Sequence, residues 1–198
     1  MKRLTTVIAT LSLAVIAGCA AKEVLIPKSA VSAGNDLSGH WQLREDSETA
    51  AKRIRDAEFA AAGGHEPLVP KGNHSSGRSA RRDSGGASVH VFLETGRSLK
   101  VTQTDYGLFI SFDRAVVEEY RFGENREVSV GPINADRVSG WEGSSYVIET
   151  LDEDDAKLIE TYQLRDDGRS LQRKITIIDK KVTQLAIKQV FDRISGSH

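Results

Sequence analysis

Apolar and polar residues alternate along the chain from Ser88 onward, as they do in strands that bury one face. Leu108, Ile110 and Phe112 occupy alternate positions in one of these runs. Short turns rich in glycine, aspartate and asparagine separate the runs, and no helical pattern lies between them. Strands joined in this way predict an antiparallel meander.

The number of runs predicts how the meander is arranged. Counting the alternating run at residues 37–43, we expect eight to ten strands within a domain that spans residues 37–194. A sheet of that size usually curls or closes, because closure removes its free edges. The sequence therefore predicts a mainly β fold that closes into one barrel, whose interior is either filled by side chains or holds one small ligand.

Two segments between the first and second strands depart from this pattern. A short helix is predicted near residues 47–62, where small apolar residues recur at helical spacing before Gly63 and Gly64 end the pattern. Residues 63–87 are rich in glycine, serine, proline and arginine, with almost nothing to bury. Such a composition cannot offset the entropy of ordering, so we expect a flexible loop.

The start of the chain has the layout of a secretory signal. Lys2 and Arg3 precede an uncharged, largely apolar run over residues 4–18, which is shorter than the ~20 residues of a spanning helix. The run ends in Ile16-Ala17-Gly18-Cys19, which resembles the lipobox of bacterial lipoproteins. The alternative is an ordinary signal peptide followed by a chance cysteine.

The resemblance to lipoproteins implies a location. In that family the cysteine is lipidated and becomes the new N-terminus, so residues 1–19 would be a signal peptide that ends in lipidated Cys19. Residues 20–36 lack periodicity and would form a tether. Ala20 is typical of lipoproteins sent to the outer membrane, which implies a protein held there by its lipid and facing the periplasm.

Composition and motifs exclude several classes of function. The chain has 27 basic and 28 acidic residues, so no strong field favours nucleic acid. Cys19 is its only cysteine, and lipidation would leave no thiol for catalysis, metal binding or a disulfide. The nucleophile elbow, the zinc-protease motif and the nucleotide-binding glycine motifs are absent. We therefore expect neither an enzyme nor a cofactor.

Possible metal ligands lack the spacing that a site needs. The acidic run 152–155 does not have the alternating oxygen ligands of a calcium loop, and a solvated turn is expected there. His65, His74 and His90 lack paired spacing. The sequence therefore predicts no metal site.

The first strand carries a second family resemblance. Gly39-x-Trp41 resembles the signature of lipocalins, which are barrels that carry small apolar ligands, and this resemblance implies a lipocalin-like barrel in which Trp41 plugs one end. The alternative is an ordinary core tryptophan. Thr104-Asp105-Tyr106 matches a second lipocalin motif but precedes too many strands, and a hairpin turn is expected there. The regions around Trp141 and residues 166–171 resemble C-terminal β segments of other bacterial exported proteins.

Two charged residues interrupt otherwise apolar faces. Glu160 lies between Leu158 and Tyr162, and Arg173 lies between Leu171 and Ile175, in two successive strands. If these strands form a hairpin, the two side chains can meet inside the barrel, either as a structural ion pair or as a polar contact in a ligand cavity. The candidate cavity-lining residues are Trp41, Glu160 and Arg173.

These observations lead to three functional hypotheses. The first is a lipid-anchored, non-catalytic binding or interaction module of the cell envelope, with an envelope protein as its partner. The second is a carrier of one small lipophilic ligand inside the barrel. The third is a hydrolase of envelope polymers that uses carboxylates at strand ends. Arg78, Arg81 and Arg82 either contact anionic lipids or an acidic partner, or simply keep the loop soluble.

Overall fold

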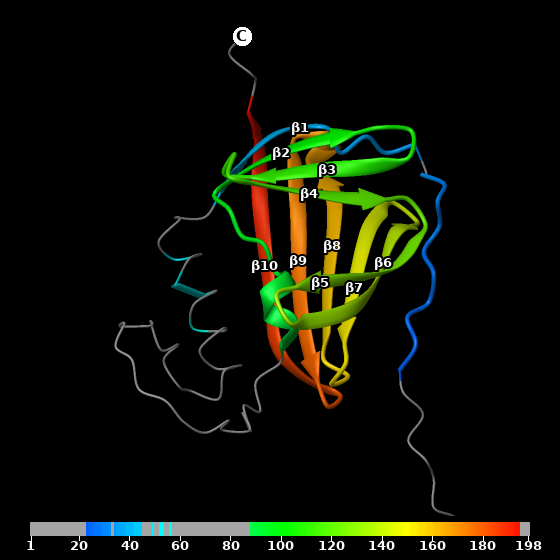
Figure 1. Ribbon diagram of the computed structural model, residues 1–198. Helices are drawn as coiled ribbons and strands as arrows, with labels where there is room; N and C mark the ends of the chain where they lie inside the picture. Colours follow the sequence, from blue (N-terminus) through cyan, green and yellow to red (C-terminus); the bar gives the residue numbers. More distant parts are fainter. Residues whose placement is uncertain are drawn as a thin grey trace, which may run out of the picture.

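The computed structural model describes residues 23–32, 34–44 and 88–194, together with four single residues, Thr49, Lys52, Arg53 and Asp56. It is almost entirely β (Figure 1). The strands are β1 (Gly39–Leu43), β2 (Ser98–Gln103), β3 (Gly107–Phe112), β4 (Val116–Arg121), β5 (Glu124–Val130), β6 (Ile133–Glu142), β7 (Ser145–Asp152), β8 (Lys157–Arg165), β9 (Ser170–Asp179) and β10 (Val182–Ile194). Two short 3₁₀ helices accompany them, η1 (Ser88–Phe92) and η2 (Asp166–Gly168).

The ten strands form one antiparallel sheet in the order β4-β3-β2-β1-β10-β9-β8-β7-β6-β5. The pairing of β1 with β10 joins the first strand to the last and bends the sheet into a nearly closed barrel. The predicted mainly β meander with a lipocalin-like barrel arrangement is therefore confirmed. β4 and β5 follow each other along the chain but lie at the two ends of the strand order, which leaves a seam between them.

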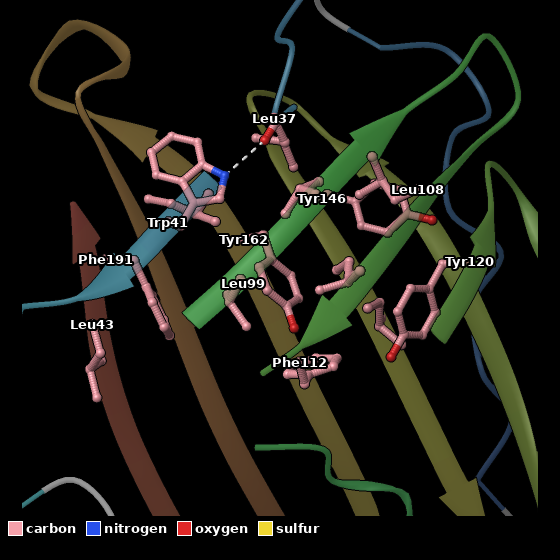
Figure 2. Packing of buried hydrophobic residues seen from close by; sticks show 14 of the residues in the cluster. Leu37, Trp41, Leu43, Leu99, Leu108, Phe112, Tyr120, Tyr146, Tyr162 and Phe191 are labelled. Atoms are coloured by element: carbon pink, nitrogen blue, oxygen red, sulfur yellow. Dashed lines mark hydrogen bonds between the residues drawn. The ribbon is translucent and has the colours of Figure 1, made fainter. Parts of the chain in front are cut away.

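The barrel interior holds two clusters of apolar side chains, one toward each end of the barrel. The aromatic cluster lies toward one end of the barrel and consists of Leu37, Trp41, Leu43, Leu99, Val101, Leu108, Ile110, Phe112, Tyr120, Trp141, Tyr146, Ile148, Tyr162, Leu171 and Phe191 (Figure 2). The η1 cluster fills the other half and consists of Val89, Phe92, Leu93, Ala135, Ala156, Leu158, Ile175, Ile177, Leu185 and Ile187. The alternating patterns in the sequence supply most of both.

η1 fills part of the barrel where the apolar pattern had predicted a strand. Val89 and Phe92 are three residues apart, so a 3₁₀ helix places them on one side, and both are buried. They pack against inward side chains of β6, β8, β9 and β10. We call the end of the barrel that contains η1 the η1 end. The turns around Pro132, Asp154 and Lys180 also lie at this end.

Trp41 closes the opposite end, which we call the Trp41 end. Its side chain is 0% exposed, and its indole Nε1 donates a hydrogen bond to the carbonyl oxygen of Leu37 at 3.2 Å (Figure 2). The guanidinium of Arg193 lies 4.1 Å from the centre of the indole ring and donates to the carbonyl oxygen of Ser38 at 2.7 Å. A Cβ at Gly39 would lie 2.6 Å from Arg193 Nη1, which explains the glycine two residues before the tryptophan.

The segment predicted as a tether lies against the barrel where the structure describes it. Ser29 forms an antiparallel bridge with Trp141 of β6. Leu25 is buried with Val138 and Leu151 on the outer face of β6 and β7. Residues 23–32 are thus held on the barrel, and we call them the N-terminal strap.

Several sequence predictions fall on residues that the structure does not describe. The signal peptide with Cys19, the loop 63–87 and most of the helix near 47–62 lie outside the described residues, although Thr49, Lys52, Arg53 and Asp56 are helical. Within the described part of the chain, no helix has the length and apolar character needed to cross a bilayer.

The first prediction concerns the closed end. We expect Trp41→Ala to lower the free energy of unfolding by about 3–5 kcal/mol, because it removes a fully buried aromatic side chain and leaves a cavity. Urea unfolding followed by circular dichroism measures this change. Tyr106→Ala, at an exposed turn position, is the control and should change stability by less than about 0.5 kcal/mol. Equal effects of the two substitutions would contradict the role of Trp41.

Candidate functional site

A layer of buried polar side chains lies in the barrel interior beside the two apolar clusters. We call it the polar belt, and it consists of Tyr120, Arg137, Thr150, Glu160, Tyr162, Arg173 and Gln189. In Figure 2 the hydroxyl groups of Tyr120 and Tyr162 lie at the lower ends of their rings, whereas Trp41 lies in the upper part of the view. Buried polar and charged groups are costly unless they are paired, so this layer is the candidate site.

Glu160 and Arg173 form an ion pair inside the barrel. β8 and β9 form a hairpin in which Tyr162 faces Arg173 and Glu160 faces Ile175, so the two charges are diagonal neighbours on one face. Arg173 Nε donates to Glu160 Oε2 at 3.0 Å, and Nη2 forms a second, shorter contact with the same oxygen. Arg173 is 0% exposed and Glu160 is 2% exposed. That this pair lines a ligand cavity stays a prediction.

Neighbouring groups complete most of the hydrogen bonding of this pair. The Tyr162 hydroxyl donates to Glu160 Oε2 at 3.1 Å. Arg173 Nη2 also donates to the carbonyl oxygen of Glu94, at 2.7 Å. The loop after η1 therefore holds the guanidinium through the same nitrogen that contacts the carboxylate.

The electrostatics of the polar belt keep its two phenols neutral and Arg173 charged. Burial raises the pKa of Tyr120 and of Tyr162 well above the usual value for a phenol. Burial lowers the pKa of Arg173, but Tyr162 and Glu160 outweigh it, and the net pKa is raised. At physiological pH the belt therefore presents a permanent cation beside hydroxyl groups that can still donate hydrogen bonds.

Two buried atoms of the belt lack a hydrogen-bond partner among the described residues. These are Arg173 Nη1 and Gln189 Oε1. The two residues are direct partners across β9 and β10, so both side chains face the interior at the same level. An unpaired buried donor or acceptor costs about 1–3 kcal/mol. A bound group that offers an acceptor to Arg173 and a donor to Gln189 would remove this cost.

Arg137 is the second buried guanidinium of the belt. Its Nε donates to Thr150 Oγ1 at 3.1 Å, and its Nη1 lies 3.5 Å from Glu118 Oε2. Its guanidinium carbon lies 5.5 Å from the centre of the Tyr120 ring and 5.8 Å from that of Phe92. Arg137 therefore links the polar belt to β4 across the seam.

A pocket of about 350 Å³ opens at the seam, and we call it the seam pocket. η1, β4 and β5 form its walls, and Arg137, Phe92, Glu94 and Glu118 line it. The five consecutive residues Arg126–Val130 also line it, and alternate side chains of a strand point to opposite faces, so the pocket exposes the backbone edge of β5. It leads from the molecular surface to a guanidinium of the polar belt.

Side-chain contacts close the seam near the β4–β5 turn. Ser139 Oγ donates to the carbonyl oxygen of Arg121 at 2.9 Å, and Arg126 Nη2 donates to that of Glu119 at 3.2 Å. The seam pocket lies farther from this turn, beside η1. The opening is therefore confined to the η1 half of the seam.

The possible metal ligands noted in the sequence can also be placed where the structure describes them. Asp152 Oδ1 accepts hydrogen bonds from the backbone amides of Asp154 and Ala156, so this carboxylate shapes the β7–β8 turn. Burial lowers the pKa of His90, which keeps its ring neutral. His65 and His74 lie outside the described residues. Among the residues that are described, no group of three or more potential ligands could hold a metal ion.

Sequence reasoning did not identify Arg137 as a site residue. Val138 is an apolar residue of β6, but it faces outward and packs against Leu25 of the strap. Arg137, Ser139 and Trp141 face inward instead. The usable signal was Trp141 itself, since counting back in steps of two from it reaches Arg137.

The second prediction concerns the buried ion pair. We expect Glu160→Gln to lower the free energy of unfolding by about 3–5 kcal/mol, because it leaves a buried guanidinium without its counter-charge. The double variant Glu160→Leu/Arg173→Met should recover most of this loss, since apolar residues can replace a buried pair. Urea unfolding measures both, with Asp154→Asn in an exposed turn as the control. A double variant less stable than Glu160→Gln would contradict this account.

Comparison with known proteins assigns the chain to no family. No model of a known protein family matches the chain, and no curated protein matches it in sequence. Secretory abundant heat soluble protein 4 from Ramazzottius varieornatus matches at 16% identity over 82% of this chain and 97% of that one, with a TM-score of 0.45. A Schistosoma mansoni fatty acid binding protein matches at 14% over 80% and 96%, with a TM-score of 0.42. The likeness is one of strand arrangement alone.

Proposed function

We propose that the chain is a lipid-anchored, non-catalytic binding module of the cell envelope whose barrel holds one small amphipathic ligand. The ligand's apolar body would lie against the apolar side chains that line the seam pocket, and its polar end would meet the polar belt. The observation that carries this proposal is that Arg173 Nη1 and Gln189 Oε1, on directly paired residues of β9 and β10, have no hydrogen-bond partner within the part of the chain that the structure describes.

The charges of the belt indicate the chemistry of the polar end. Two guanidinium groups, those of Arg173 and Arg137, are buried. Of the carboxylates that contact them, that of Glu160 is buried and that of Glu118 is partly exposed at the seam. A guanidinium in an apolar setting favours an oxygen acceptor, above all one that carries negative charge. A hydroxyl or carboxyl group on an apolar molecule supplies that acceptor.

The seam pocket provides the route to the belt. Its volume of about 350 Å³ falls within the range of small-ligand sites. A ligand passing between η1 and β5 would meet Phe92 and Arg137, whose guanidinium carbon lies 5.8 Å from the centre of the Phe92 ring. An envelope protein that adds to the exposed β5 edge is the partner that the interaction hypothesis requires.

The envelope location rests on the sequence. Ile16-Ala17-Gly18-Cys19 supports lipidation of Cys19, and Ala20 supports the outer membrane, with the barrel facing the periplasm. Two or three acyl chains hold a protein durably, whereas one holds it weakly.

The third prediction tests the interior site. Native mass spectrometry of the gently purified protein should show a bound lipophile that denaturation releases. The fluorescent anion 1-anilinonaphthalene-8-sulfonate should bind wild type, and Glu160→Leu/Arg173→Met should weaken its binding about tenfold, because a hydrogen bond to a charged group contributes about 1.5–3 kcal/mol.

Lys188→Met, at an exposed position of β10, is the control for this experiment and should leave the affinity for the dye unchanged. Equal dissociation constants for wild type and the double variant, together with a preparation free of lipophile, would refute the interior site.

The fourth prediction tests the anchor. Cys19→Ser should move the protein from the membrane fraction to the soluble periplasmic fraction and abolish the mass gain from acylation. Cell fractionation and intact-mass measurement check both results. Unchanged sedimentation with membranes and a wild-type mass without lipid would refute the anchor.

A further inference from the structure

The N-terminal strap runs along the outside of β6 and β7 toward the η1 end (Figure 1). Lys28 Nζ contacts Glu142 Oε1 at 2.6 Å and Glu149 Oε1 at 2.9 Å, and its side chain is only 7% exposed. Closer to the N-terminus, Glu23 forms an ion pair with Lys157 at the start of β8. The strap is therefore fixed at several points along its length.

These contacts are well suited to persist at physiological pH. Burial lowers the pKa of Lys28, but hydrogen bonds to Glu142 and Glu149 outweigh it, so the net pKa is raised. The lysine stays charged throughout the neutral range. Gly140 contributes in a different way, because a Cβ there would lie 2.5 Å from the carbonyl oxygen of Ser29 and would push the strap away.

The fixed strap limits where Cys19 can lie. Cys19 precedes Glu23 by four residues, and a fully extended chain spans at most about 3.6 Å per residue, so their Cα atoms lie within about 14 Å. The whole segment 20–36, if it were free, could extend about four times as far. The strap thus keeps the lipidation site close to Lys157 and the η1 end.

The η1 end also carries exposed apolar side chains. Val24, Val91, Val130 and Val182 are all exposed there, on the strap, η1, β5 and β10. Its turns carry both signs of charge, with Glu153, Asp154 and Asp155 in one and Lys180 and Lys181 in another. Apolar contact suits the bilayer interface, whereas this mixed charge does not select anionic head groups.

We propose that the lipid on Cys19 holds the barrel with its η1 end against the bilayer surface and its Trp41 end in the periplasm. This orientation rests on the proposed acylation of Cys19, but it adds that the strap, and not the lipid alone, sets the direction. The seam pocket lies beside η1, so it opens next to the membrane. A lipophilic ligand then passes between bilayer and polar belt with little exposure to water.

The test measures the distance of each end from a membrane. Lipidated full-length protein is placed in vesicles of phosphatidylethanolamine and phosphatidylglycerol at a ratio of about 7:3 that carry a fluorescent acceptor lipid. Because the thiol of Cys19 is consumed by acylation, a single new cysteine at Val182→Cys or Tyr106→Cys takes a donor dye selectively. The 13 residues of β10 span roughly 40 Å, so the two ends are distinguishable.

We expect strong energy transfer from the Val182→Cys label and weak transfer from the Tyr106→Cys label. Adding Lys28→Glu should bring the two values together while the protein stays on the vesicles, because the strap is released and the lipid is not. Lys188→Glu is the matched charge reversal and should leave both values unchanged.

The outcomes separate the two proposals. Vesicle-bound wild type with equal transfer from both labels, or stronger transfer from the Tyr106→Cys label, would overturn the orientation and leave the anchor intact. Wild type that carries no lipid and stays off the vesicles would overturn both. Unchanged transfer in Lys28→Glu would show that the strap does not set the direction.

Discussion

The pairing of β1 with β10 is the constraint on which the rest of the structure depends. It joins the first strand of the chain to the last, so the free edges of the sheet fall at β4 and β5 and not at the chain ends. The same pairing brings Arg193 of β10 over Trp41 of β1 and closes one end of the barrel. The seam, and with it the pocket that reaches Arg137, is the consequence of closing the sheet at this place.

The barrel interior combines apolar packing with charges that must be neutralised. Arg173 meets Glu160, a backbone carbonyl and two aromatic rings, yet one of its nitrogens keeps no partner among the described residues. A filled barrel of this size could be entirely apolar, and apolar residues often replace buried pairs without loss of stability. Stability alone therefore does not require the polar belt.

Sequence reasoning predicted the buried strand faces correctly where burial of one face fixes the alternation of apolar and polar residues. The runs that contain Leu108 and Phe112, or Ile175, predicted buried strand faces, and the spacing of Glu160 and Arg173 anticipated their contact because a single hairpin joins them. Sequence reasoning failed where a residue is buried on the outer face of the barrel by a segment far away in the sequence. Val138 looks like a core residue but is covered from outside by Leu25, a neighbour 113 positions earlier that no local pattern reveals.

The N-terminal strap has a mechanical consequence. Tension applied through the start of the chain pulls along the strap, parallel to β6 and β7, and not away from them. The Lys28 ion pairs and both backbone hydrogen bonds between Ser29 and Trp141 then bear load in shear, all at once, whereas a perpendicular pull would peel them apart one after another. The attachment of the strap to the barrel therefore resists a pull along the chain better than a pull away from the barrel.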